Sequence, residues 1–303
     1  MPILSTPPRL HLIANLWTLT DHPTTTTGRE WSLERKLAAI RDSGFDGFTD
    51  ALGPEHSRLA GKLGLAAIGY FASSRPSHFR SLIRKNRDSG ALRINVQLGN
   101  HDTPVESAIG MAMRLNEEAE VLGIPCDIEV HRDTCTETPE KTHAIAAGYR
   151  KATGRLLSLT WDFSHFAVVK HLAPPFWDRL LTNAPLVRQA RQFHFRPFNG
   201  HHCQIPVTDG CGHLAAEFTQ WLPFLEKTFA LILAGKNTGH DIYACPEMGP
   251  VRGGYNLAQL PCCWEDAKVL RPIIRQTWDD ALAVHQRMVW DRNDPERLFT
   301  PPP

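Results

Sequence analysis

The 303-residue chain has only seven cysteines, and no two of them are spaced as C-x-x-C. An odd number without that spacing argues against a disulfide framework and against a zinc ribbon. The amino-terminal segment also lacks the basic, apolar and small-residue regions of a secretory signal. We therefore expect a cytoplasmic protein whose cysteines are reduced and serve mainly in packing.

Charge and hydropathy favour neither a nucleic acid nor a membrane as partner. The 33 basic residues are balanced by 32 acidic ones, so the net charge is +1 and no overall field would attract a polyanion. No apolar run approaches the roughly 20 residues of a membrane helix. Walker A, G-x-G-x-x-G, G-x-S-x-G and calcium-loop motifs are also missing. Since neither a nucleic acid nor a membrane is favoured, we expect the partner to be a small molecule.

Strand-like and helix-like segments alternate along the chain. Strand patterns lie at 9–16, 45–52, 65–71, 92–99, 126–132, 156–165, 191–198 and 240–249. Helix patterns lie at 31–44, 78–90, 102–123, 138–154, 174–184, 213–235 and 264–290. The helix at 78–90 is basic on a face that we expect to be solvated. Thr103 and Thr138 are the predicted N-caps of their helices, each followed by proline.

This alternation predicts an α/β protein with a single (β/α)8 TIM barrel. Parallel strands need crossover connections, and eight βα units in about 300 residues fit a closed barrel. A doubly wound open sheet is the alternative, but it would normally bring a glycine-rich first turn that the sequence does not have. No Pro/Gly/Ser linker divides the chain, so we expect one domain over 1–303 with short proline-rich tails.

Polar side chains gather at the ends of the last four predicted strands, where a barrel carries its active site. They are Glu129, His131 and Arg132 after strand five, Asp162 and His165 after strand six, His194 and Arg196 after strand seven, and Glu247 after strand eight. Neighbouring strands lie about 4.8 Å apart, so side chains from four adjacent ends can converge on one ion.

Three carboxylates and one imidazole suit Mn²⁺, Mg²⁺ or Co²⁺, and could also hold Zn²⁺. Six-coordination would leave two positions for two substrate oxygens, as chelation of a hydroxy-ketone requires. Each residue alone has an ordinary reading, since an acid at a strand end usually caps a helix. The ordered set on four successive strands is what favours a metal site.

Four motifs resemble those of the xylose isomerase-like TIM barrels, a group of sugar isomerases and epimerases. They are "IEVHRDT" with Glu129, "WDFSH" with Asp162 and His165, "FHFRP" with His194, and "CPEMGP" with Glu247. The resemblance covers most of the chain, and it is strongest from 126 to 250. It implies that Glu129, Asp162, His194 and Glu247 bind one divalent ion, with Mn²⁺ as the expected metal.

The resemblance also implies a reaction and further roles. Glu129 and Glu247 would both move protons, one removing the proton next to the carbonyl and the other returning one while the metal holds the enediolate. His165 and Arg196 would contact substrate oxygens. His131 and Arg132 would lie at the mouth, as contacts to sugar hydroxyls or a carboxylate or as plain loop residues.

The loop at 196–213 allows two interpretations. Its histidines could hydrogen-bond locally in a partly ordered lid, or His202 could reach the substrate. Among aromatic residues, Trp17 and Trp161 could stack on a sugar ring, and Tyr255 could cover the pocket.

Other reactions remain open. An enediolate beside a leaving group can eliminate, as in keto-inositol dehydratases and 3-keto-glycoside lyases, and His101 or His202 could then serve as general acid. An endonuclease IV-like hydrolase is less favoured, because Asp209 and His213 lack the close Asp-x-His spacing. A non-catalytic scaffold is the third alternative. The substrate could be a free or phosphorylated sugar, an inositol or a glycoside, and the protein could form homo-oligomers.

Overall fold

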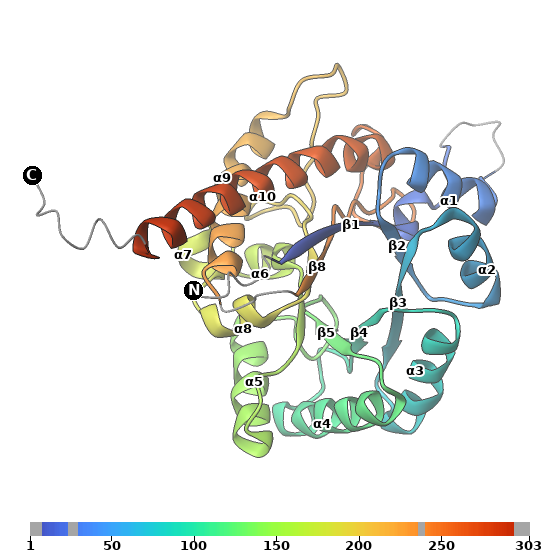
Figure 1. Ribbon diagram of the computed structural model, residues 1–303, viewed down its shortest axis with the longest axis vertical. Helices are drawn as coiled ribbons and strands as arrows, with labels where there is room; N and C mark the ends of the chain where they lie inside the picture. The colour runs from blue at the N-terminus through green and yellow to red at the C-terminus, as the bar shows by residue number, and fades with distance from the viewer. Residues whose placement is uncertain (1–7, 24–29, 236–239, 294–303) are drawn as a thin grey trace, which may run out of the picture.

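The computed structural model describes residues 8–23, 30–235 and 240–293. Eight strands pair in parallel in chain order, and β8 pairs with β1 to close a barrel, which confirms the predicted TIM barrel (Figure 1). The strands are β1 Arg9–Asn15, β2 Gly47–Asp50, β3 Ala66–Ser73, β4 Arg93–Leu98, β5 Cys126–Glu129, β6 Leu159–Trp161, β7 Gln192–His194 and β8 Asp241–Cys245. The predicted proline-rich tails fall largely outside the described residues.

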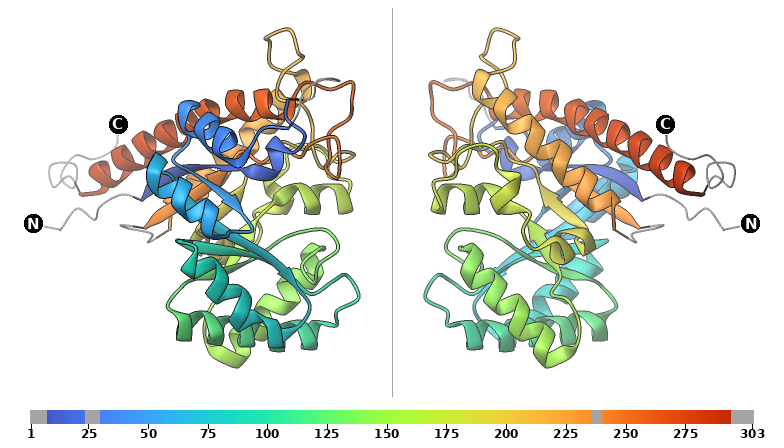
Figure 2. Two further views of the ribbon diagram at one scale, coloured as in Figure 1. Left: turned by 90° about the vertical axis from the view of Figure 1, so that its right-hand side faces the viewer. Right: turned by 90° about the vertical axis from the view of Figure 1, so that its left-hand side faces the viewer.

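Helices surround the barrel (Figures 1 and 2). They are α1 Leu33–Asp42, α2 Pro54–Leu63, α3 Phe79–Asp88, α4 Val105–Leu122, α5 Pro139–Thr153, α6 Phe163–Val169, α7 Trp177–Leu180, α8 Ala184–Gln189, α9 Ala216–Leu233 and α10 Cys263–Asn293, with 3-10 turns η1 Leu16–Leu19 and η2 Pro76–His78. The last helix packs against α9 and β1. No helix within the described ranges is both long and apolar enough to cross a membrane.

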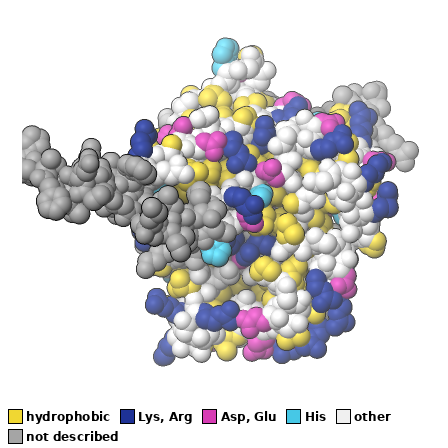
Figure 3. All heavy atoms as spheres, viewed as in Figure 1, with side chains coloured by type: hydrophobic (Ala, Val, Ile, Leu, Met, Phe, Trp, Pro, Cys, Tyr) yellow, Lys and Arg dark blue, Asp and Glu magenta, His cyan; other side chains and the backbone are white. Residues whose placement is uncertain are grey.

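Helix α3 shows how sequence pattern becomes packing. Phe79 and Ile83 lie one turn apart and are buried, whereas Arg84, Lys85 and Arg87 are exposed. Figure 3 shows basic side chains gathered at the lower right, where Figure 1 places α3. The predicted solvated face of this helix is therefore confirmed.

Polar side chains line much of the inside of the barrel. On β4, Ile94, Val96 and Leu98 belong to the hydrophobic core, while the alternate residues Arg93, Asn95 and Gln97 bond to β5. Deeper in the barrel, Asp127 accepts two hydrogen bonds from Arg93, each 2.9 Å, and one of 2.6 Å from Gln192 of β7.

The bond from Gln192 skips strand β6, so it crosses the barrel interior. The alternation of apolar and polar residues along β4 thus directs its apolar side chains toward the helices and its polar side chains into the barrel.

Several element boundaries differ from the sequence prediction. Predicted strand six extended to residue 165, but β6 ends at Trp161 because Asp162 caps α6. The helix expected at 174–184 is limited to α7, the following helix α8 begins only at Ala184, and neither α8 nor α2 was predicted. Thr103 does not cap α4: Pro104 is the N-cap, and the Thr103 hydroxyl instead bonds to Asn100.

Candidate metal centre

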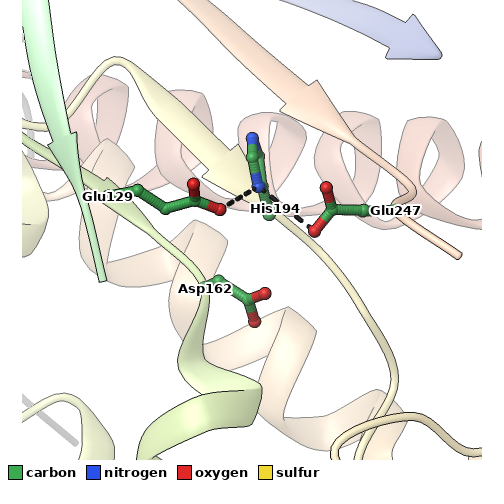
Figure 4. Close-up of side chains that lie close together, drawn as sticks. All are labelled: Glu129, Asp162, His194 and Glu247. Carbon is green, nitrogen blue, oxygen red and sulfur yellow. Dashed lines mark ion pairs between the residues drawn. The ribbon is translucent and has the colours of Figure 1, made fainter. Parts of the chain in front are cut away.

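Four side chains meet at the carboxyl ends of the last four strands. Glu129 and His194 are the last residues of β5 and β7, Asp162 directly follows β6, and Glu247 follows β8 by two residues. All four are buried, and one potential ligand atom from each lies within 4.8 Å of the others. In Figure 4, Glu129 and Glu247 face each other across His194, with Asp162 below them.

Asp162 serves both as a helix cap and as a member of this cluster. Its Oδ1 accepts hydrogen bonds from the backbone N–H of Ser164 at 3.0 Å and from the Ser164 hydroxyl at 2.6 Å. Its Oδ2 lies 3.2 Å from His165 Nε2 and 3.2 Å from Arg196 Nη2, without hydrogen-bond alignment to a described residue. Oδ1 therefore caps helix α6, while Oδ2 is the oxygen that faces the cluster.

Glu129 is held by two amides from β4. Its Oε2 accepts hydrogen bonds from Asn95 at 2.9 Å and from Gln97 at 3.0 Å. Tyr70 of β3 in turn donates to Gln97 Oε1 at 2.9 Å, which fixes the amide orientation. The other oxygen, Oε1, lies 2.9 Å from His194 Nδ1.

Glu247 has the same arrangement on the other side. Asn15, at the end of β1, donates to its Oε1 at 2.5 Å, and the Asn15 side chain accepts from the Trp17 N–H at 3.0 Å. Oε2 lies 3.3 Å from His194 Nδ1 and is also bonded by Arg196. Each glutamate thus has one oxygen fixed by amides and the other beside the imidazole.

The donor set fits a divalent ion. His194 Nδ1 and Asp162 Oδ2 are buried, and neither makes an aligned hydrogen bond with a residue of the described ranges. His194 Nδ1 lies 2.9 Å from an oxygen of Glu129 and 3.3 Å from one of Glu247, and the four potential ligand atoms all lie within 4.8 Å of one another. Three carboxylates and an imidazole are hard or borderline ligands, so the cluster is a candidate site for a divalent metal.

Burial and neighbouring charges oppose each other in this cluster. Burial alone would lower the pKa of His194, but Glu247 and Glu129 raise it well above its ordinary value. Burial would raise the pKa of both glutamates, yet His194 lowers them. The pKa of Asp162 is likewise lowered, by Arg196 and His165, against the effect of burial.

His165 and Arg196 lie behind the cluster. His165 is buried on α6, and Asp162 raises its pKa to about 9 although burial lowers it. Cys203 Sγ lies 3.5 Å from His165 Nδ1, a contact that the sequence did not suggest. The guanidinium of Arg196 is 1% exposed and lies 4.3 Å from the Tyr255 ring.

A cavity of about 330 Å³ adjoins these groups. Strands β1–β4 and their following loops contribute mainly neutral polar groups and a tryptophan: Asn15, Trp17, Thr49, Tyr70, Asn95 and Gln97. Strands β5–β8 and their loops contribute most of the charged groups and a tyrosine: Glu129, His131, Arg132, His194, Arg196, Glu247 and Tyr255. The sequence analysis did not identify the amide side chains as site residues. For Asn95 and Gln97, the only sign in the sequence is the alternation of polar and apolar residues in "RINVQL".

Other predicted contacts lie elsewhere. His202 is exposed and bonds locally to Asn199, and it does not line the cavity as far as the described residues define it. His101 is exposed and bonds to Asp133. Trp161 is buried in the core, stacked 4.9 Å from Phe163, so its predicted place against a sugar is wrong.

The loop after β7 is anchored rather than free. Buried Asp266 of α10 accepts from the backbone N–H groups of Val207 at 2.8 Å and Thr208 at 3.2 Å, and from the Thr208 hydroxyl at 2.7 Å. Gln204 exchanges two hydrogen bonds with the backbone of Gly249. These contacts tie the loop to distant segments, whereas the hydrogen bonds of His202 with Asn199 and of His213 with Asp209 are local, as one of the two interpretations expected.

The glycine of "CPEMGP" has a packing reason. A Cβ atom on Gly249 would lie 2.6 Å from the ring of Trp17 and 3.0 Å from that of Tyr255. Only glycine therefore allows these two aromatic rings to close over the cavity beside Glu247.

Comparison with known proteins shows a likeness of fold. No protein-family model matches the chain, and no curated protein matches it in sequence. A D-tagatose 3-epimerase-like protein aligns with a TM-score of 0.57 at 14% identity, over 89% of this chain and 99% of that one. A xylose isomerase-like TIM barrel protein from Mycobacterium smegmatis, solved in complex with magnesium, aligns with a TM-score of 0.52 at 16% identity, over 88% and 97%. The chain thus has the fold of the xylose isomerase-like TIM barrels, with a buried Glu/Asp/His/Glu group at the carboxyl ends of the last four strands.

Proposed function

We propose that this protein is a divalent-metal-dependent isomerase or epimerase that acts on a keto sugar or a polyol-derived ketone through an enediolate. The observation that carries the proposal is the pair of buried carboxylates, Glu129 and Glu247, on opposite sides of His194 (Figure 4). One oxygen of each glutamate accepts hydrogen bonds from side-chain amides, two for Glu129 and one for Glu247, and the other oxygen faces the centre of the site.

A divalent ion held by Glu129, Asp162, His194 and Glu247 would polarise the substrate carbonyl and stabilise negative charge on the enediolate oxygens. One glutamate removes the proton from the carbon beside the carbonyl, and the other returns a proton to it. The two carboxylates lie on opposite sides of the site. A proton can therefore leave one face of the substrate carbon and another proton can be added to the opposite face, which inverts the configuration of that carbon.

The remaining cavity groups have roles in binding. Arg196, Arg132 and His131 contact substrate oxygens in this proposal. His165 acts through Asp162, which it contacts at 3.2 Å, rather than on the substrate. The similar barrel from Mycobacterium smegmatis binds magnesium, in agreement with a hard divalent ion here. Mn²⁺ is our proposed metal, with Mg²⁺, Co²⁺ and Zn²⁺ as alternatives.

Elimination is the second candidate reaction, because the same enediolate could expel a neighbouring group. It would require a general acid at the leaving group. The two histidines proposed for that task, His101 and His202, are both exposed and are not among the described residues that line the cavity. Their positions favour isomerisation.

The test is proton exchange in D₂O on a panel of keto sugars, keto-inositols and 3-keto-glycosides, with Mn²⁺ and then with a chelator. Metal-dependent deuterium at the carbon beside the carbonyl is the expected result. An epimer or aldose as product supports isomerisation, and an unsaturated or cleaved product supports elimination. No exchange despite a filled metal site would overturn the enediolate proposal.

A further inference from the structure

The cavity contains one guanidinium that forms no ion pair with a carboxylate of the described residues. Arg132 lines the cavity, and its side chain makes no ion pair or hydrogen bond with any residue that the structure describes. The other cavity arginine, Arg196, is bonded to Glu247 and close to Asp162. Arg252, exposed on the loop after β8, makes two contacts of 2.5 Å to Asp21. Arg132 therefore differs from both in having an unoccupied hydrogen-bonding fork.

Arg132 is held in place although it is exposed. Its carbonyl accepts a hydrogen bond from His131 Nδ1 at 2.6 Å, and its guanidinium carbon lies 4.5 Å from the centre of the Tyr255 ring. The loop around it is fixed by the bond from Thr134 Oγ1 to the His131 carbonyl at 2.7 Å. Stacking on an aromatic ring costs the guanidinium little of its hydration and leaves its N–H groups available in the plane.

Tyr255 supplies a second unused donor beside it. Its hydroxyl is buried and has no hydrogen-bond partner among the described residues, although its ring lines the cavity. A buried hydroxyl without a partner is unfavourable, so a ligand that accepts a hydrogen bond from it would relieve that cost. The Tyr255 side chain, whose hydroxyl has no acceptor among the described residues, and a guanidinium without an ion pair thus line the same cavity.

This arrangement suits a carboxylate better than a phosphate. The planar fork of arginine matches the two oxygens of a carboxylate in a bidentate pair. A phosphate usually engages several cations or a helix amino terminus. Here Arg196 is occupied, and Nδ1 of His131 is engaged with the Arg132 carbonyl.

Building on the proposed function, we infer that the substrate is a keto sugar acid whose carboxylate binds Arg132 and accepts a hydrogen bond from the Tyr255 hydroxyl. The reacting carbonyl end would then lie toward Glu129 and Glu247, and the acid end toward the mouth of the cavity. Neutral ketoses would fit the same site but would leave the guanidinium unpaired.

The inference can be tested by titration calorimetry of the Mn²⁺-loaded protein with three ketoses that differ at one carbon. These are D-fructuronate, with a carboxylate, D-fructose, with a hydroxymethyl group, and D-fructose 6-phosphate. We expect D-fructuronate to bind about tenfold more tightly than either of the others, the gain of one good charged hydrogen-bonded pair. Arg132→Gln should remove that preference, and Tyr255→Phe should reduce it several-fold while keeping the ring.

Arg252→Gln is the matched control, because it removes an exposed charge from a loop that also borders the cavity. It should keep the preference for the acid. Equal affinity of the wild-type protein for the acid and the neutral sugar, tighter binding of the phosphate, no binding of D-fructuronate, or a preference that survives Arg132→Gln would each overturn the inference.

Deuterium exchange in the same samples separates this inference from the proposed function. Arg132-dependent binding of the acid without exchange would leave the carboxylate subsite standing and reject the enediolate reaction. Metal-dependent exchange on D-fructose without any preference for the acid would do the opposite.

Discussion

At the residue scale, the site brings three carboxylates together where little water can reach them. None of Glu129, Asp162 and Glu247 is more than 4% exposed. Such a group is stable only when cations lie between the acids. Here His194 lies between the two glutamates and Arg196 between Asp162 and Glu247. A divalent ion would add positive charge at the same place, which is why the acids are the residues to test first.

Glu129→Gln and Glu247→Gln should each abolish turnover while leaving the fold intact. The amide keeps the size of the side chain but cannot accept a proton from carbon, so a loss on the order of 10²–10⁴ or greater is expected. The measurement is deuterium exchange, with circular dichroism as the check on folding. Glu55→Gln, an exposed change on α2, is the control. Activity retained in either variant would remove the two-glutamate mechanism.

Two buried histidines should differ in their importance for the metal. His194 offers Nδ1 to the centre of the cluster, whereas His165 contacts Asp162 from behind. His194→Ala should therefore lower Mn²⁺ occupancy, measured by elemental analysis after dialysis, much more than His165→Ala does. Equal occupancy in the two variants would mean that His194 is not a ligand.

Metal binding should release a proton. The carboxylates raise the pKa of His194 well above 6.5, so in the metal-free protein the imidazole is protonated at pH 7. A ligating imidazole must be neutral, so the proton has to leave as the ion binds. Mn²⁺ affinity should fall roughly tenfold for each unit of pH decrease below that pKa. Calorimetry in buffers of different ionisation enthalpy measures the released proton directly, and its absence would contradict the prediction.

At the scale of elements, the loop after β7 depends on a helix that follows it by about 50 residues in the chain. Asp266, at the start of α10, accepts three hydrogen bonds from Val207 and Thr208 and is 1% exposed. The carboxylate takes the place of the backbone partners that a loop cannot supply for itself. This bond network holds Cys203 and Gln204 against the site.

Asp266→Ala should destabilise the protein by about 3 kcal/mol, because it leaves the buried N–H of Val207 and the partly buried N–H of Thr208 without partners. Urea unfolding measures the loss, and limited proteolysis should show new cleavage within 201–213. Asp279→Ala, an exposed position on the same helix, should have little effect. Unchanged proteolysis in Asp266→Ala would show that other contacts hold the loop.

At the scale of the whole molecule, the candidate metal site links the ends of four strands that are distant in sequence. Glu129 and Glu247 are contributed by β5 and β8, and Asn15 of β1 extends the network across the closure of the barrel. An ion bound there stabilises only the folded chain. We propose that the described residues unfold together as one domain, so a bound ion should raise the free energy of unfolding of the whole domain.

Mn²⁺ at about 100 times its dissociation constant should stabilise the protein by about 2.7 kcal/mol. For a chain of this size, that corresponds to a rise in the melting temperature of roughly 4 °C. Thermal unfolding with Mn²⁺ and with chelator measures the shift. His194→Ala should show almost none, and the same shift in that variant would place the stabilising ion elsewhere.

The amino-acid sequence by itself was enough to predict the barrel and the four members of the candidate metal cluster. Hydrophobic periodicity is a local property, and in a parallel barrel every strand ends on the same side. The positions of Glu129, Asp162, His194 and Glu247 along the chain were therefore enough to predict that they meet. The dual role of Asp162 shows the limit of that argument, since its helix cap and its place in the cluster share one sequence signal.

Only the tertiary structure decided which side chains support that cluster. Asn15, Asn95 and Gln97 reach the glutamates from strands whose sequences carry no motif, and Asp266 orders the 196–213 loop from another helix. Their partners are 32 to 232 residues away, so no local pattern records them. His202 and Cys203 are neighbours in the chain, yet one faces solvent and the other contacts His165. The direction of a loop side chain depends on what packs against it, and that is settled when distant segments of the chain come together.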